Sequence, residues 1–178
     1  MTPEAQLEGS EVGFYPTEPG WFIVNARETV WVQVEGLAAK APFEAPNAWF
    51  SQVGIGLNLL SPGEPMAFYH AEEAQEDFLV LSGECVLVVE GKEHRLRAWD
   101  FFHCPSGTEH VLVGAGQEPC LVLAVGARVP QERFVYPLNE VAARYGASVA
   151  EETTSPDEAY AGFPEWRPIP CPPGFPPP

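Results

Sequence analysis

Short runs of apolar residues, rich in Val, Ile and aromatic side chains, recur through the middle of the chain. They cover residues 21–25, 29–34, 49–60, 66–69, 77–81, 84–90, 94–98, 101–104, 110–113 and 120–125. Gly, Pro or acidic turns bound these runs, as is typical of β-strands. No helical pattern lies between them to connect parallel strands. The pattern therefore predicts an all-β, antiparallel sandwich or barrel over residues 20–135.

Both ends of the chain lack this pattern. Residues 1–19 place acidic residues among Pro and Gly without a sustained period, which predicts a loose N-terminal arm. Residues 151–178 are first acidic and then dense in proline, which favours an extended polyproline conformation. We expect this tail to lie across its own barrel or a neighbouring subunit, or to be disordered.

One short helix is expected between the barrel and the tail, within residues 136–150. Asn139 is a suitable N-cap for residues 140–145, and Gly146 is a typical stop. Apolar residues within this segment recur at helical spacing. We expect the helix to pack on the outside of the barrel.

The composition limits the class of protein. The 178 residues allow one domain with a sizeable core, and 25 acidic against 9 basic residues give a formal net charge of -16. An acidic surface repels polyanions, so we expect no nucleic acid and no membrane among the partners. No apolar stretch approaches the ~18 residues of a spanning helix, and residues 1–19 lack the features of a signal peptide. We predict a cytoplasmic protein with three buried, reduced thiols at Cys85, Cys104 and Cys120.

Polar residues gather where the chain leaves the run at 66–69. His70 and Glu72 are two positions apart, so in a continuing strand their side chains leave on the same face. Glu76 follows after a short excursion, and apolar residues of the next strand share its face. We expect the pocket around these groups to be lined by Met66, Phe68, Phe78, Val80, His103 and Leu112.

A second polar segment lies further along the chain. Pro105-Ser106-Gly107 and His110 form a Pro-x-Gly-x-x-His sequence, in which glycine allows a tight turn before an inward-pointing imidazole. His103 has two interpretations: a group beside the cavity, or a hydrogen-bonded strand residue involved only in packing. Cys104 has no identifiable base, so the sequence does not indicate a nucleophile.

The two segments together predict a metal site. His70, Glu72, Glu76 and His110 offer two imidazoles and two carboxylates to one chamber. Such donors suit one divalent metal ion, Fe(II), Mn(II), Ni(II) or Zn(II). Two alternatives stay open: Glu72 is either a ligand or a solvated carboxylate at the rim, and the whole group is either a metal site or a hydrogen-bonded polar pocket.

The first segment resembles the first motif of the cupin family, within residues 63–83. Glu76 and Gly83 have the six-residue spacing of that motif, and His70 occupies the first histidine of its His-x-His element. Glu72 stands at the second histidine. This departure replaces a nitrogen donor with an anionic oxygen, which favours harder ions or leaves three protein ligands.

The second segment, residues 99–114, resembles the second cupin motif. Pro105-Ser106-Gly107 and His110 match its centre, while Trp99 and Gly114 replace the glycine and the asparagine at its two ends. The resemblance covers about residues 54–126 and depends on matches at two separated places.

The resemblance implies a fold and a range of functions. It implies a double-stranded β-helix, or jelly-roll barrel, to which the residues outside the motifs add a short C-terminal helix and an extended proline-rich tail. It implies a metal ion that coordinates a small oxygen-bearing molecule, in a dioxygenase, an isomerase, a decarboxylase or a non-catalytic binding module. It also implies a homodimer, the commonest symmetric assembly.

Overall fold

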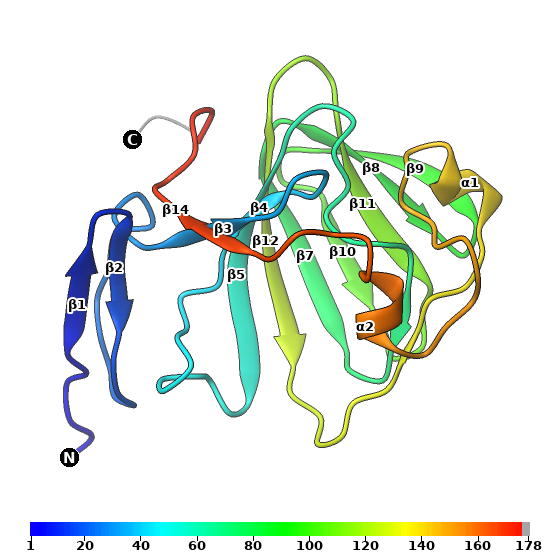
Figure 1. Ribbon diagram of the computed structural model, residues 1–178. Coiled ribbons are helices and arrows are strands. Elements are labelled where there is room, and N and C mark those ends of the chain that lie inside the picture. Colours follow the sequence, from blue (N-terminus) through cyan, green and yellow to red (C-terminus); the bar gives the residue numbers. More distant parts are fainter. Residues whose placement is uncertain (176–178) are drawn as a thin grey trace.

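The computed structural model describes residues 1–175 and consists mainly of two antiparallel sheets that face each other (Figure 1). The larger sheet contains, in spatial order, β10 (Phe101–Cys104), β7 (Glu76–Ser82), β12 (Cys120–Ala127), β5 (Val53–Leu60), β4 (Ala39–Ala41), β3 (Trp31–Gln33) and β14 (Arg167–Ile169). The smaller sheet contains β11 (His110–Ala115), β8 (Glu84–Val89) and β9 (Lys92–Arg97). The antiparallel all-β prediction is confirmed.

The main core lies between the two sheets. It joins Phe78, Val80 and Val122 of the larger sheet to Cys85, Leu87 and Leu112 of the smaller one. Side chains alternate across a strand, so the residues between these in sequence face outward. Three buried free thiols, at Cys85, Cys104 and Cys120, confirm the prediction made for these cysteines.

Gly83 lies where the chain leaves the larger sheet for β8 of the smaller one. Its φ is +75°, and a Cβ atom there would lie 2.5 Å from the Pro119 carbonyl oxygen. Both the left-handed backbone and the lack of space require glycine. This explains physically why the first motif ends in glycine.

The N-terminal arm corrects the expectation from sequence. Residues 1–19 contain a hairpin of β1 (Leu7–Ser10) and β2 (Gly13–Pro16) in place of a loose segment. The turn between β1 and β2 was not recognised in this acidic segment. In it, the Ser10 hydroxyl accepts a hydrogen bond from the Val12 amide, and Gly13 has a φ of +135°.

Two predicted strands are wrong. In the run at 21–25, Trp21 forms a single bridge to Glu4 and Ile23 is 85% exposed, because no neighbouring strand pairs with this segment. The run at 66–69 is irregular, although the Met66 amide donates to the Leu112 carbonyl. Apolar composition alone does not make a strand without a partner to complete its hydrogen bonds.

The expected helix is shorter than predicted. α1 (Glu140–Ala143) begins after Asn139, whose side chain accepts from the Val141 and Ala142 amides. Ala142 packs into a cluster on the outer face of the smaller sheet, where the helix was expected. A second short helix, α2 (Pro156–Ala159), capped by Ser155, was not predicted.

Up to residue 175, the tail lies across its own barrel, one of the alternatives considered; its last three residues lie outside the described part of the chain. β14 pairs with β3 at the end of the larger sheet, and the Phe175 ring lies 5.5 Å from that of Trp31. A separate two-stranded ribbon joins β6 (Ala71–Glu72) to β13 (Phe134–Val135). Among residues 1–175, no helix is both long and apolar enough to cross a membrane.

Candidate metal centre

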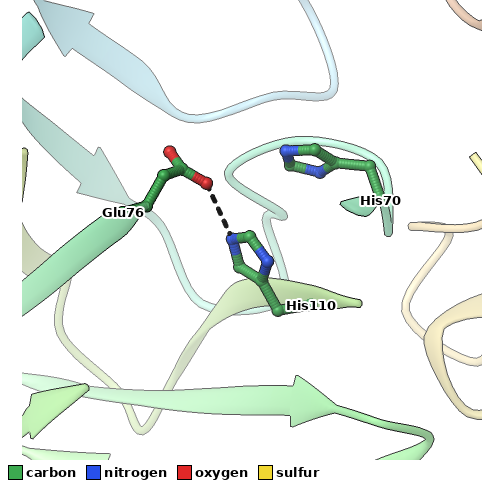
Figure 2. Close-up of side chains that lie close together, drawn as sticks. All are labelled: His70, Glu76 and His110. Atoms are coloured by element: carbon green, nitrogen blue, oxygen red, sulfur yellow. Dashed lines mark ion pairs between the residues drawn. The ribbon is translucent and has the colours of Figure 1, made fainter. Parts of the chain in front are cut away.

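Three side chains converge at one end of the space between the sheets (Figure 2). One ligand atom from each of His70, Glu76 and His110 lies within 4.8 Å of the others. Glu76 begins β7 and His110 begins β11, while His70 just precedes β6. The backbones of the two histidines form a mutual bridge, with N···O distances of 3.1 and 2.8 Å. This bridge brings their rings to a centroid separation of 5.0 Å.

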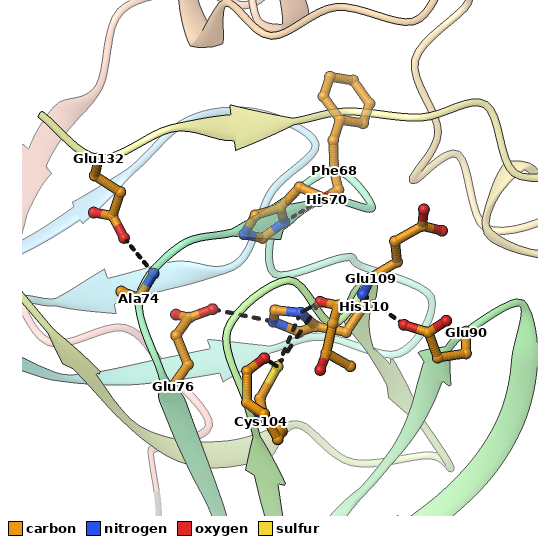
Figure 3. A network of polar contacts seen from close by, with 11 residues as sticks. Phe68, His70, Ala74, Glu76, Glu90, Cys104, Glu109, His110 and Glu132 are labelled. Atoms are coloured by element: carbon orange, nitrogen blue, oxygen red, sulfur yellow. Dashed lines mark hydrogen bonds and ion pairs between the residues drawn. The ribbon is translucent and has the colours of Figure 1, made fainter. Parts of the chain in front are cut away.

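Both imidazoles are oriented by backbone carbonyls. His70 Nδ1 lies 2.7 Å from the Phe68 carbonyl oxygen, and His110 Nδ1 lies 3.1 Å from that of Thr108 (Figure 3). A carbonyl only accepts hydrogen bonds, so each Nδ1 carries the hydrogen. The Nε2 atoms are thereby left as the nitrogens that can bind a metal, the arrangement usual for ligating histidines.

The facing atoms of His110 and Glu76 lack other partners. Nε2 of His110 lies 3.2 Å from Oε2 of Glu76, close enough for an ion pair but without hydrogen-bond geometry. Both atoms are buried, and neither has a hydrogen-bond partner among residues 1–175. Orphaned buried polar atoms are rare and indicate a missing ion or water. Two imidazole nitrogens and a carboxylate oxygen therefore fit a divalent ion.

Burial and mutual contact shift the titration of these groups. Burial, followed by the charge of His110, lowers the pKa of His70 to about 4. Burial opposes protonation of His110 too, but contacts with Cys104 and Glu76 outweigh it and raise its pKa to about 10. Burial would raise the pKa of Glu76, yet His110 lowers it. Without a metal, the centre therefore contains a charged His110–Glu76 pair beside a neutral His70.

Glu72 lies outside the three-residue cluster. Glu72 lies opposite Phe134 in the β6–β13 ribbon, and none of its oxygens is among the clustered ligand atoms of His70, Glu76 and His110. Glu72 instead lines a cavity together with Glu76 and Glu132. Burial, followed by these two carboxylates, raises the pKa of Glu72. This placement favours the rim carboxylate over the fourth ligand.

A cavity of about 390 Å³ opens beside the cluster, and Glu76 belongs to both. Met66 lines it, as expected. Phe78, Val80 and Leu112 belong instead to the packed core, where the Phe78 ring lies 5.3 Å from that of His110. These three residues pack in the core next to the candidate centre and do not line the cavity.

Two residues expected in the pocket lie elsewhere. The Phe68 ring is directed away from the cluster (Figure 3) and stacks on Tyr160 at 5.0 Å. His103 faces outward, with its side chain 54% exposed and its Nδ1 2.7 Å from Asp77. The pocket prediction is wrong for both, because Phe68 lies in an irregular segment and His103 lies between inward-facing neighbours.

The sequence analysis missed five polar residues of the cavity wall. They are Lys40, Glu44, Asn58, Arg128 and Glu132. The sequence of β5 contained a weak indication of the cavity. Gly54, Gly56 and Asn58 alternate with apolar residues, so one face of this strand carries no large apolar side chain at these positions. Lys40 lies in a three-residue strand that is too short to be predicted.

Comparisons with known proteins agree with this fold. The model of the cupin domain family matches residues 57–126. The structure of the polyketide cyclase RemF from Streptomyces resistomycificus is 18% identical, with a TM-score of 0.56 over 71% of this chain and 93% of that one. An RmlC-like cupin from Shewanella frigidimarina is 16% identical, with a TM-score of 0.52 over 63% and 95%. These two similarities concern the fold alone.

A sugar phosphate isomerase of the cupin superfamily from Silicibacter pomeroyi is 32% identical over 48% of this chain, with a TM-score of 0.46. The match spans 56% of that protein's length. No curated protein matches the chain.

The fold is the jelly-roll barrel of cupins, and two separated segments of the chain supply the three clustered side chains. Residues 57–126 match the cupin domain family.

Proposed function

We propose that His70, Glu76 and His110 bind one divalent metal ion, and that a small oxygen-bearing molecule in the adjoining cavity coordinates it. One observation carries the proposal: Oε2 of Glu76 and Nε2 of His110 face each other, buried and without hydrogen-bond partners among residues 1–175. Glu72 remains outside the ligand set as a carboxylate of the cavity wall.

The donor set favours oxygen chemistry with Fe(II). Two histidines and one carboxylate are the ligands of non-haem Fe(II) oxygenases, in which the ion offers open positions to dioxygen and substrate. The chain's own residues orient the ligands and keep the inner side of the centre dry. Phe78 and Phe102 stack at 5.8 Å and pack their rings against His110. An isomerase using Mn(II), Ni(II) or Zn(II) would use the same three ligands.

A second candidate is a non-catalytic module that binds a small molecule. The observation that favours it is the 3.2 Å contact between His110 and Glu76, because their opposite charges compensate each other without an ion. In that case the centre is a structural ion pair beneath a ligand cavity.

Metal analysis separates the two candidates. Protein purified without an affinity tag should contain, or take up, close to one equivalent of a transition metal. A content below about a tenth of an equivalent, with no uptake on reconstitution, would remove the metal proposal. A His103→Ala variant is the matched control, since His103 lies on the outer face and should not affect metal content.

Oxygen consumption then tests the reaction. The Fe(II)-loaded protein is supplied with diketones, thiols and catechols, and uptake of dioxygen with at least one class supports an oxygenase. Absence of uptake with every class, in protein that retains its metal, favours the isomerase or the binding module.

The homodimer and the cytoplasmic location stay predictions. Light scattering on the purified full-length chain measures the first, and cell fractionation measures the second.

A further inference from the structure

Four carboxylates and two cations line the cavity, and one of the cations, Lys40, forms no ion pair with the residues that the structure describes. Lys40 of β4 and Asn58 of β5 are directly paired across the two strands, so their side chains share one face. Asn58 pairs in turn with Val122, a core residue between the sheets, which identifies that face as the inner one. Both residues line the cavity.

Lys40 differs from the other cation of the cavity. Arg128 is held by Glu44 at 2.7 Å, so its charge is compensated. Lys40 forms no ion pair with the residues that the structure describes, and its Nζ lies 3.9 Å above the Trp166 ring. A ring face stabilises a cation only partly. Burial lowers the pKa of Lys40, which is the expected effect of a shielded ammonium without a carboxylate nearby.

Asn58 supplies a second polar side chain on the same wall. It is 8% exposed and lines the cavity. The amide nitrogen of asparagine can donate two hydrogen bonds. An ammonium and an amide that face the same cavity both offer hydrogen-bond donors to one acceptor group.

Small residues separate this pair from the metal centre. Gly126 of β12 lies beside Glu76 of β7 and opposite Gly54 of β5, and Ala124 lies opposite Gly56. These positions line the cavity and carry no side chain larger than a methyl group. The Arg128 guanidinium lies over Gly54. The cavity of about 390 Å³ touches both Glu76 and Lys40, so one molecule in it can reach both.

We infer that Lys40 and Asn58 bind a carboxylate group of the ligand, at the end of the cavity away from Glu76. The ligand is then a small organic acid with a second oxygen-bearing group directed toward His70, Glu76 and His110. The direction of this second group rests on the proposed metal site, whereas the contact with Lys40 does not.

Calorimetric titration of the full-length, Zn(II)-loaded protein with succinate and glutarate tests the inference. We expect saturable binding of at least one of them. Lys40→Met should weaken it on the order of tenfold to hundredfold, because a charge-assisted hydrogen bond is lost. Lys40→Arg should retain most of the affinity, and Lys92→Met, at an exposed lysine, should bind like the unaltered protein. The monoamide of the bound acid should bind more weakly.

Two results would overturn the inference: a Lys40→Met affinity within about twofold of the unaltered protein, or no binding of either acid below about 10 mM. Urea unfolding of each variant shows that the fold is retained. If the unaltered protein takes up no metal, the proposed function fails, and the same titration of the metal-free protein still measures the effect of Lys40. The two failures are therefore distinguishable.

Discussion

Adjacent residues of β7 form two carboxylate–histidine pairs on opposite faces of one sheet. Glu76 faces inward and lies 3.2 Å from His110, whose side chain is 1% exposed. Asp77 faces outward and lies 2.7 Å from His103, whose side chain is 54% exposed. The outer pair is closer in distance, yet only the inner one is joined by a second imidazole.

The difference shows that burial, rather than distance, separates a site from a surface contact. Water solvates and screens Asp77 and His103, so their attraction contributes little free energy. Inside, Glu76 and His110 have lost that solvation, and their facing atoms have no hydrogen-bond partner among residues 1–175. Four changes, ordered by expected size, test this contrast.

The largest effect is expected on metal binding. Glu76→Gln removes the anionic donor, so metal affinity should fall by about 100-fold or more. Asp77→Asn, one residue away on the other face, should leave it unchanged. Metal content after dialysis against defined free metal measures both. Equal losses in the two variants would contradict the contrast between the faces.

Side-chain packing should also differ between the inner and the outer face of the larger sheet. Phe78 is 1% exposed and packs on His110, so Phe78→Ala should lower the free energy of unfolding by about 3–5 kcal/mol. Phe101, 63% exposed on the neighbouring strand, should cost less than about 0.5 kcal/mol when changed to alanine. Urea titration measures both values, and similar costs would show that the inner face is not the packed one.

Removal of the metal should lower the stability of the protein, and this loss should depend on Glu76 but not on Asp77. At free metal about 100 times Kd, binding contributes about 2.7 kcal/mol, so a chelator should lower Tm by roughly 5–10 °C. Asp77→Asn should show the same shift and Glu76→Gln none. Calorimetric scans with and without chelator provide the measurement; a shift that persists in Glu76→Gln would place the metal elsewhere.

The smallest effect is expected for the outer pair. Partial burial would raise the pKa of Asp77, but hydrogen bonds from His103 and Gln75 lower it from its ordinary value of 3.8. A carboxyl whose pKa is lower in the folded state adds stability above its unfolded pKa and loses it as the pH falls through the folded value.

Asp77→Asn should therefore cost about 0.2–1 kcal/mol at neutral pH and nothing once the pH has fallen below the folded-state pKa of Asp77. Urea unfolding at neutral and at acidic pH, in low and high salt, measures it. A difference that is independent of pH would show that the effect is not electrostatic.

Much of the candidate site could be predicted from the sequence, because two of its residues lie in motifs of fixed spacing. Glu76 begins a strand of alternating pattern, and His110 follows a turn defined by proline and glycine. The face on which His103 lies could not be predicted. Its strand carries apolar residues on both faces, so no alternation of polar and apolar residues shows which face is the inner one. The role of Glu72 could not be predicted, because sequence spacing does not show whether its carboxylate reaches the clustered atoms of His70, Glu76 and His110.

By itself, the sequence determined the antiparallel strands, the positions of Glu76 and His110 at strand beginnings, and the short helix near residue 140, because periodicity and turn residues are local properties. Only the tertiary structure decided which carboxylate lies next to which histidine, because these contacts depend on how strands that are distant in the sequence pair with one another. Pairing also placed Lys40 beside Asn58 and the tail strand against β3. The inner face of β7 is a candidate site because the second sheet covers it and excludes water there.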